Sequence, residues 1–126
     1  MSNDKPKIII IDNNRDLCRI YEDTLNSAGY EAISICNEEE ALTAIAKELP
    51  DLVLLDILMP KISGLHILDR ICKDHHTHNV DVIILTEVSD SNIKKKALAH
   101  GAKDYVIKSE TNMTQLLHMI DKAISR

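Results

Sequence analysis

The chain has 126 residues, and 15 Lys and Arg stand against 20 Asp and Glu, which gives a formal net charge of -5 with histidine neutral. This length suits one domain over residues 1–126, and 44% hydrophobic with 28% charged residues is typical of a globular protein. The excess of acid argues against DNA binding by this chain, and the absence of Trp and Phe argues against a base-stacking platform.

The first apolar run, Ile8–Ile11, is too short for a signal peptide or a membrane span. We therefore expect a cytoplasmic protein that makes no membrane contact. The three cysteines, Cys18, Cys36 and Cys72, lie far apart and form no Cys-x-x-Cys pair. We interpret them as reduced, buried thiols.

Short runs rich in Ile, Val and Leu predict five strands. Ile8–Ile11 and Leu52–Leu55 are continuously apolar, as in parallel strands that are covered on both faces. The predicted strands are Lys7–Ile11, Glu31–Ile35, Asp51–Leu55, Val80–Leu85 and Lys103–Ile107.

Between these runs, apolar residues recur at three- and four-residue intervals, which predicts helices. The first helix stops at Gly29, and the second begins at the cap Asn37 and ends at Pro50. The other three run from about Gly64 to Asp74, from Ser89–Asp90 to Gly101, and from about Asn112 onward. In chain order, the residues predicted to face inward are Leu17, Ile20, Tyr21, Thr24, Leu25 and Ala28; Ala41, Leu42, Ile45 and Leu49; Leu65, Leu68, Ile71 and Cys72; Ile93, Ala97 and Leu98; and Met113, Leu116, Leu117, Ile120 and Ile124.

Alternating strands and helices predict an α/β fold with right-handed crossovers and helices on both faces of the sheet. The length favours a flavodoxin-like (βα)5 arrangement, which is a doubly wound parallel five-stranded sheet in the order 2-1-3-4-5. Ligands of such folds bind beyond the carboxyl ends of the strands.

Polar residues directly follow four of the predicted strands: Asp12-Asn13-Asn14, Asp56, Thr86-Glu87 and Lys108-Ser109. The first strand is not followed by a Gly-rich loop, which excludes a dinucleotide fingerprint and a P-loop. Because parallel strands end at one edge of a sheet, we expect these side chains to converge there.

The residue types at this edge suit phosphoryl transfer with a divalent cation. Asp12 and Asp56, with a backbone carbonyl just past Asp56, offer the oxygen ligands that Mg²⁺ prefers. A carboxylate can also attack phosphorus and form an acyl phosphate. Lys108 can neutralise phosphoryl oxygens, and Thr86 can donate a hydrogen bond to one of them.

Two segments carry a resemblance to a known family. Asp51–Gly64, which reads DLVLLDILMPKISG, resembles the phosphoacceptor segment of response regulator receiver domains of the CheY-like superfamily. Gly101–Lys108, which reads GAKDYVIK, resembles the fifth-strand signature of the same family. The resemblance extends over essentially the whole chain and implies a single receiver domain without an output domain.

The resemblance also implies roles for individual residues. Asp56 would be the phosphorylated aspartate and Lys108 the phosphate-binding lysine, while Thr86 and Tyr105 would be the switch residues. Mg²⁺ would be held by Asp12, the neighbouring Asn13, Asp56 and the carbonyl of Leu58. The partners would be a histidine kinase or phosphotransfer protein and a downstream protein that binds the surface of the fourth helix, fifth strand and fifth helix. Such a domain accepts a phosphoryl group and is not a turnover enzyme.

Three residues depart from the family pattern. Asn13 stands where a second acid is usual, so it can offer an amide oxygen but no charge. Glu87 stands where a small residue is usual, and it would either restore the missing charge or obstruct the phosphodonor. Ser109 stands where proline is frequent, so we expect no cis peptide bond there.

Other interpretations of these residues stay open. A degenerate receiver would act as a phosphorylation-independent interaction module, which Asn13 and Glu87 favour. An aspartate-nucleophile phosphatase would need a general acid two residues after Asp56, where Leu58 stands. Tyr105 is equally compatible with a half-buried strand aromatic.

Two further clusters have simple alternatives. Cys72, His75, His76 and His78 have spacings that zinc can accept, but a polar loop at the opposite edge of the sheet explains them better. Lys94–Lys96 is expected to be a solvated helix face, on the surface that receivers of this family use for partners.

Overall fold

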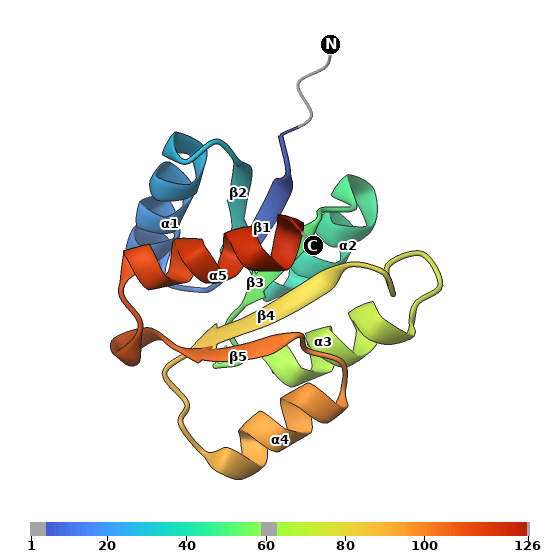
Figure 1. Ribbon diagram of the computed structural model, residues 1–126. Coiled ribbons are helices and arrows are strands. Elements are labelled where there is room, and N and C mark those ends of the chain that lie inside the picture. The colour runs from blue at the N-terminus through green and yellow to red at the C-terminus, as the bar shows by residue number, and fades with distance from the viewer. Residues whose placement is uncertain (1–4, 59–62, 126) are drawn as a thin grey trace.

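The computed structural model describes residues 5–58 and 63–125 of the chain. Five strands and five helices alternate, and one short 3-10 helix, η1, follows the last strand (Figure 1). In chain order the elements are β1 (Lys7–Ile11), α1 (Arg15–Ser27), β2 (Glu31–Ile35), α2 (Glu38–Glu48), β3 (Leu52–Leu55), α3 (Gly64–Lys73), β4 (Asp81–Thr86), α4 (Ser91–Ala99), β5 (Asp104–Ile107), η1 (Lys108–Glu110) and α5 (Met113–Ser125).

The five strands form one parallel sheet in the order β2-β1-β3-β4-β5, which confirms the predicted fold class and strand order. Three predicted strands differ from the observed ones at their ends, because pairing begins at Leu52 with Asp81 and at Ile83 with Asp104. As a result β3, β4 and β5 each begin one residue later than predicted, and β4 also runs one residue further, to Thr86.

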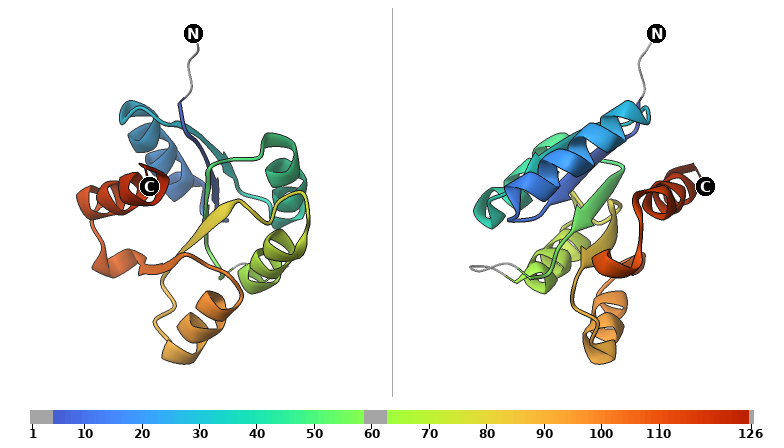
Figure 2. Two further views of the ribbon diagram at one scale, coloured as in Figure 1. Left: turned by 45° about the vertical axis from the view of Figure 1, so that its right-hand side comes forward. Right: turned by 90° about the vertical axis from the view of Figure 1, so that its left-hand side faces the viewer.

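Helices α1 and α5 cover one face of the sheet, and α2, α3 and α4 cover the other (Figure 2). Because successive strand residues point to opposite faces, β1 supplies Ile8 and Ile10 to one core and Ile9 and Ile11 to the other. The two cores bury the sheet on both sides, as the continuous apolar runs predicted. None of the helices in the described ranges is long and apolar enough to cross a bilayer.

Local signals in the sequence explain where several helices begin and end. Asn37 caps α2 by accepting a hydrogen bond from the N–H of Glu39 (2.8 Å), as predicted. Gly29 and Gly101 follow α1 and α4 with positive φ angles of 99° and 116°, a region that favours glycine. Asn112 accepts a hydrogen bond from the N–H of Gln115 (2.8 Å) just before α5.

The predicted inner faces are wrong at four positions and leave out buried residues, Glu38 and Ile67 among them. Ile20, Leu98 and Ala28 are exposed because Tyr21, Ala97 and Leu25 take the inward directions on their helices. Leu49 is exposed because α2 ends at Glu48, and Leu49 turns away with a left-handed φ of 44°. Ile67, which is absent from the predicted face of α3, is fully buried.

Candidate functional site

Four strand ends bring the predicted polar residues together at one edge of the sheet. Asp12, Asp56 and Thr86 follow or end β1, β3 and β4, and all three are buried. Lys108 directly follows β5, and its side chain is only 10% exposed. We call the arrangement of Asp12, Asp56, Thr86 and Lys108 the acidic pocket.

Lys108 joins the two buried carboxylates. Its Nζ donates hydrogen bonds to Oδ2 of Asp12 (2.6 Å) and Oδ2 of Asp56 (2.9 Å). Burial alone would lower the pKa of the Lys108 ammonium, but the hydrogen bonds to Asp12 and Asp56 outweigh burial and raise this pKa above its ordinary value. The ammonium therefore stays protonated beside two acids, and these three groups carry a formal charge of -1.

The second oxygen of each carboxylate is also held. Oδ1 of Asp12 accepts the N–H of Asn14 (3.0 Å), and Oδ1 of Asp56 accepts the N–H of Leu58 (3.0 Å). Each acid thus binds the backbone two residues further along the chain, in the manner of an Asx turn. Both side chains are fixed with their Oδ2 atoms directed at Lys108.

The two predicted switch residues meet at Val88, in the loop between β4 and α4. The hydroxyl of Thr86 accepts the N–H of Val88 (3.4 Å), and the Tyr105 hydroxyl donates to the carbonyl of Val88 (2.6 Å). Tyr105 is buried, which raises the pKa of its hydroxyl. It is thus a buried strand aromatic that is also bonded to the loop following Thr86.

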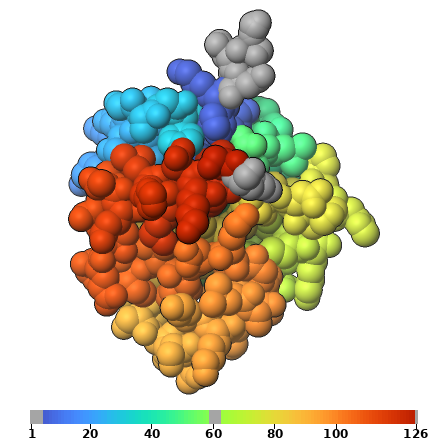
Figure 3. All heavy atoms as spheres, viewed as in Figure 1, coloured from blue at the N-terminus to red at the C-terminus, as the bar shows by residue number. Residues whose placement is uncertain are grey.

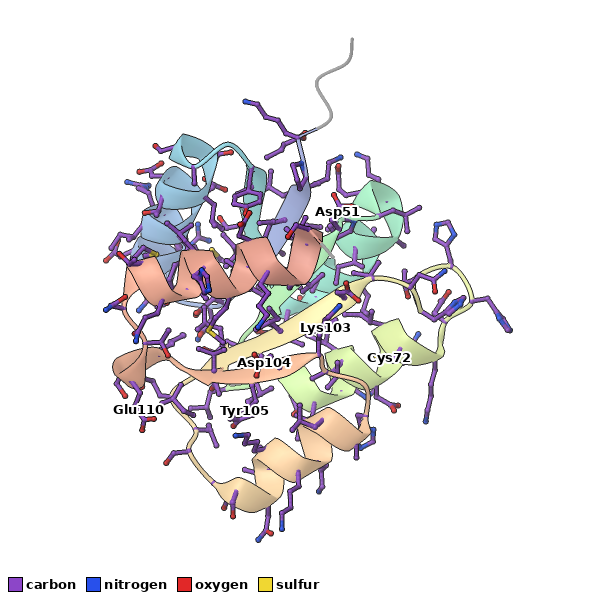
Figure 4. The ribbon with its side chains drawn as sticks, in the orientation of Figure 1. Asp51, Cys72, Lys103, Asp104, Tyr105 and Glu110 are labelled. Carbon is purple, nitrogen blue, oxygen red and sulfur yellow. The ribbon has the colours of Figure 1, made fainter. Side chains whose placement is uncertain are left out.

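Figure 4 places Tyr105 on β5 and Glu110 just beyond that strand, near the edge that carries the acidic pocket. Cys72 lies at the other end of the domain, near the end of α3.

Glu87 is exposed, and its carboxylate is bonded outside the acidic pocket. Its Oε1 accepts the N–H of Ser109, the residue after Lys108, at 3.2 Å. The described residues contain no cis peptide bond, in agreement with the expectation for Ser109.

The remaining predicted metal ligands lie at the rim of the acidic pocket. Asn13 and Leu58 are both exposed, while the N–H of Leu58 binds Asp56. Met59 and Pro60, which belong to the family-like run, lie outside the described residues. Two carboxylates, an amide and a backbone carbonyl are hard oxygen donors, and this donor set fits Mg²⁺.

Two neighbours of the acidic pocket were interpreted from sequence only as core residues. Cys18 is buried, and its Sγ donates to the backbone carbonyl of Asp12 (3.2 Å); burial and the adjacent Cys36 raise the pKa of its thiol to about 12. Burial raises the pKa of the Tyr21 hydroxyl; the charge of Lys108 opposes this rise, and acidic charges that include Asp12 add to it. Their helical spacing from the end of β1 was the available signal, since it directs both side chains back toward that strand end.

The histidine-rich loop between α3 and β4 binds backbone carbonyls. His76 Nε2 lies 3.0 Å from the carbonyl of Ala46, and His78 Nδ1 lies 2.9 Å from that of His75. Within residues 5–58 and 63–125, no three His, Cys, Asp or Glu side chains are grouped to hold a metal ion. The cysteines are free; Cys18 is buried, whereas Cys36 and Cys72 are only half-buried, which corrects the expectation of burial for those two.

Comparison with known proteins agrees with this geometry. The family model described as "Response regulator receiver domain" matches residues 8–121. The chain is 36% identical over 127 residues to the "Probable transcriptional regulator ycf27" of Porphyridium aerugineum, with 96% of this chain and 52% of that protein covered. It is 31% identical over 103 residues to "Phosphate regulon transcriptional regulatory protein PhoB" of Rhizobium meliloti, with 82% and 45% covered. The chain thus spans about half the length of these curated relatives.

Solved structures give the same result. A putative response regulator from Chloroflexus aurantiacus superposes with a TM-score of 0.87 at 29% identity, covering 97% of this chain and 99% of that one. A CheY-like response regulator receiver domain protein from Methanospirillum hungatei superposes with a TM-score of 0.88 at 25% identity, covering 95% and 94%.

Proposed function

This chain belongs to the response regulator receiver domain family of two-component systems, and from that premise we propose that Asp56 accepts a phosphoryl group from the phosphohistidine of a histidine kinase or phosphotransfer protein. An oxygen of Asp56 forms a bond to phosphorus while the bond from phosphorus to the histidine nitrogen breaks. The product is an acyl phosphate on Asp56. We expect one phosphoryl group per chain, taken up in the cytoplasm, without substrate turnover.

The observation that carries this proposal is the convergence of Asp56, Asp12 and Lys108. Lys108 Nζ lies 2.9 Å from Oδ2 of Asp56, so a fixed positive charge already stands beside the proposed acceptor. Phosphoryl transfer depends mainly on positioning and on neutralising phosphoryl oxygens, and Lys108 can do both. The hydroxyl of Thr86, which is buried beside the same strand ends, would donate a hydrogen bond to another phosphoryl oxygen.

Asp12, Asp56, the amide of Asn13 and the carbonyl of Leu58 would hold Mg²⁺. When bound, the metal ion supplies further positive charge opposite the phosphoryl oxygens. Because Asn13 brings no charge, we expect Mg²⁺ to bind more weakly than it would with a third carboxylate in the pocket. An effective dielectric of about 20 gives about 4 kcal/mol for two unit charges about 4 Å apart, before compensation.

The signal would leave through the surface formed by α4, β5 and α5. If Thr86 turns toward the phosphoryl group, its bond with Val88 changes, and Val88 also holds the Tyr105 hydroxyl (2.6 Å). Tyr105 lies on β5 beneath this surface, which the orange and red residues dominate in Figure 3. A downstream protein that binds this surface would therefore detect the phosphoryl group.

A second function, a phosphorylation-independent interaction module, is favoured by one observation. Lys108 already pairs with both Asp12 and Asp56, and Asn13 adds no third acid to recruit a metal ion. Such a domain would present the same surface in one fixed state.

Intact-mass analysis after incubation with acetyl phosphate and Mg²⁺ separates the two functions. The phosphoacceptor proposal expects the chain to gain the mass of one phosphoryl group, and Asp56→Asn to gain none. Asp23→Asn, an equal loss of charge at an exposed position on α1, should behave like the wild type. If the wild type gains no phosphoryl group at any Mg²⁺ concentration, the proposal is wrong and the interaction module is supported.

A further inference from the structure

We propose that Glu87 is a positioning residue, whose carboxylate ties the loop between β4 and α4 to the segment after Lys108 and so holds Thr86 in place at the acidic pocket. This inference rests on the proposed function, because it treats Thr86 and Lys108 as the groups that bind the phosphoryl oxygens. Glu87 is exposed and takes no direct part in the proposed phosphoryl transfer, so its role would be to position other residues.

Glu87 lies directly after the last residue of β4, where the pairing of this strand with β5 has just ended. The pairing of β4 with β5 ends at Thr86 and Ile107, and beyond it the two chains separate toward α4 and η1. The Glu87 carboxylate accepts the N–H of Ser109 (3.2 Å) at this point of separation. The Glu87 side chain thus continues the connection between β4 and β5 past their last backbone pair. It does so directly after Thr86 and Lys108, the two residues of these strand ends that belong to the acidic pocket.

The loop between β4 and α4 is also bonded to β5, one residue beyond Glu87. The next residue, Val88, is held by Tyr105 through its carbonyl (2.6 Å) and by Thr86 through its N–H (3.4 Å). The loop is therefore fixed to β5 by Tyr105 and to η1 by Glu87. Thr86 precedes both attachments, so the loop path that they fix also fixes the backbone that carries its hydroxyl.

We call the hydrogen bond between the Glu87 carboxylate and the Ser109 N–H the tether. Glu87 also carries a negative charge, and the effect of this charge has to be distinguished from the effect of the tether. Its charge is one of those that raise the pKa of the buried Tyr21 hydroxyl, as the charges of Asp12 and Asp56 also do. The negative charge of Glu87 should therefore repel an anionic phosphodonor that approaches the acidic pocket. The loss of the tether and the loss of the charge should change phosphorylation in opposite directions.

Three variants separate the two effects. Glu87→Gln removes the charge but keeps a side-chain oxygen that can accept the Ser109 N–H. Ser109→Pro keeps the charge but removes the donor, because proline has no N–H; since proline also restricts the backbone of Lys108, its result counts only where Glu87→Ala gives the same one. Glu87→Ala removes both. Glu110→Ala, an exposed acid three residues beyond Ile107, is the control for a change of net charge alone.

The first measurement is the initial rate of Asp56 phosphorylation at increasing acetyl phosphate concentration with Mg²⁺. Loss of the tether should lower the limiting rate of Ser109→Pro and Glu87→Ala about fivefold, the factor for one hydrogen bond. Glu87→Gln should stay within about twofold of the wild-type limiting rate and should reach half of that rate at a lower donor concentration. Glu110→Ala should keep the wild-type limiting rate.

The second measurement is amide hydrogen exchange by NMR in the unphosphorylated protein. Exchange should become faster at Ser109 and Val88 in Glu87→Ala, and at Val88 in Ser109→Pro, while Glu87→Gln stays near the wild type. If Glu87→Gln loses as much limiting rate as Glu87→Ala, the charge matters and the tether does not. If a lowered thermal unfolding midpoint shows that Ser109→Pro is unfolded under the assay conditions, the comparison of Glu87→Ala with Glu87→Gln decides the question.

These measurements also keep the two proposals apart. If the wild type gains no phosphoryl group, the proposed function is wrong, and hydrogen exchange at Ser109 still tests the tether. If the wild type is phosphorylated and Glu87→Ala leaves both the limiting rate and the exchange at Ser109 unchanged, the function stands and the tether is wrong.

Discussion

Lys108 is buried between the carboxylates of Asp12 and Asp56, so its ammonium sets the charge of the acidic pocket. Without this ammonium, two buried acids would stand in the pocket with no cation bonded to them. Removing one partner of a buried ion pair leaves its counterpart desolvated, and this loss exceeds what the pair itself contributes. Lys108 therefore has a structural effect that precedes any phosphoryl chemistry.

We predict that Lys108→Met lowers the free energy of unfolding by roughly 2 kcal/mol near neutral pH, less than for a fully enclosed pair because the side chain is 10% exposed. Urea unfolding of the two proteins measures the difference. Lys95→Met, at an exposed position on α4, should change the stability by less than about 0.5 kcal/mol. Equal stability of Lys108→Met and the wild type would contradict the prediction.

The pH dependence of this difference has a definite sign. The hydrogen bonds to Asp12 and Asp56 raise the pKa of Lys108 above its ordinary value of 10.5. In neutral and mildly alkaline solution the charged Lys108 therefore contributes its full stability, and this contribution is lost as the pH rises above 10.5 and through the raised pKa. The stability gap between the wild type and Lys108→Met should consequently narrow in strongly alkaline solution.

The meeting of Asp12, Asp56, Thr86 and Lys108 could be predicted because each residue stands at the end of a strand, and parallel strands end at one edge. The bonds among these residues could not. Whether Lys108 takes one carboxylate or both depends on side-chain rotations, and whether Glu87 covers the pocket depends on the path of a loop. Neither quantity has a periodic signal in a sequence.

At the scale of elements, the first residue of α3 fixes how closely this helix approaches Asp56. A Cβ atom added to Gly64 would lie 2.3 Å from Cα of Ile57 and 2.5 Å from the carbonyl oxygen of Asp56. The N–H of Gly64 also donates to the carbonyl of Ile57 (3.3 Å). The start of α3 thus rests directly on the backbone that follows β3 and carries Asp56.

We predict that Gly64→Ala lowers the free energy of unfolding by about 3 kcal/mol, because the added methyl group meets backbone that cannot move without displacing Asp56. The matched control is Gly29→Ala. Its φ is positive, but an added Cβ atom would meet no other residue's packing within 4 Å. The free energy of unfolding of that control should fall by only about 1 kcal/mol, because of backbone strain alone. Urea unfolding compares them, and a smaller loss for Gly64→Ala than for Gly29→Ala would refute the prediction.

Element type and order could be predicted here, whereas the helix ends and the residues that face inward could be predicted only in part. The error at Leu49 comes from the helix end, since a periodic pattern does not reveal that α2 stops one residue earlier in a left-handed turn. The errors at Ile20 and Leu98 come from neighbouring apolar residues that compete for one inward direction. Ile67 was missed because Leu68 beside it already satisfied the pattern.

At the scale of the whole molecule, the sheet separates two apolar cores. Ile67 on α3 and Ile120 on α5 are both fully buried, but they lie in different cores on opposite faces of the sheet. The β-strands link these cores, because alternate residues of one strand belong to each. A domain built in this way should unfold as one unit, even though its two cores share no helix.

We predict that Ile67→Val and Ile120→Val each lower the free energy of unfolding by about 1 kcal/mol, the usual cost of removing one buried methylene from isoleucine. The double variant should lose the sum to within about 0.5 kcal/mol, because the sheet prevents one cavity from being filled by the other core. Within each variant, circular dichroism and tyrosine fluorescence should give the same urea midpoint as each other. Tyr21 and Tyr30 belong to one core and Tyr105 to the other, so fluorescence reports on both. If either substitution separates the two signals, the cores unfold independently and the domain is not one cooperative unit.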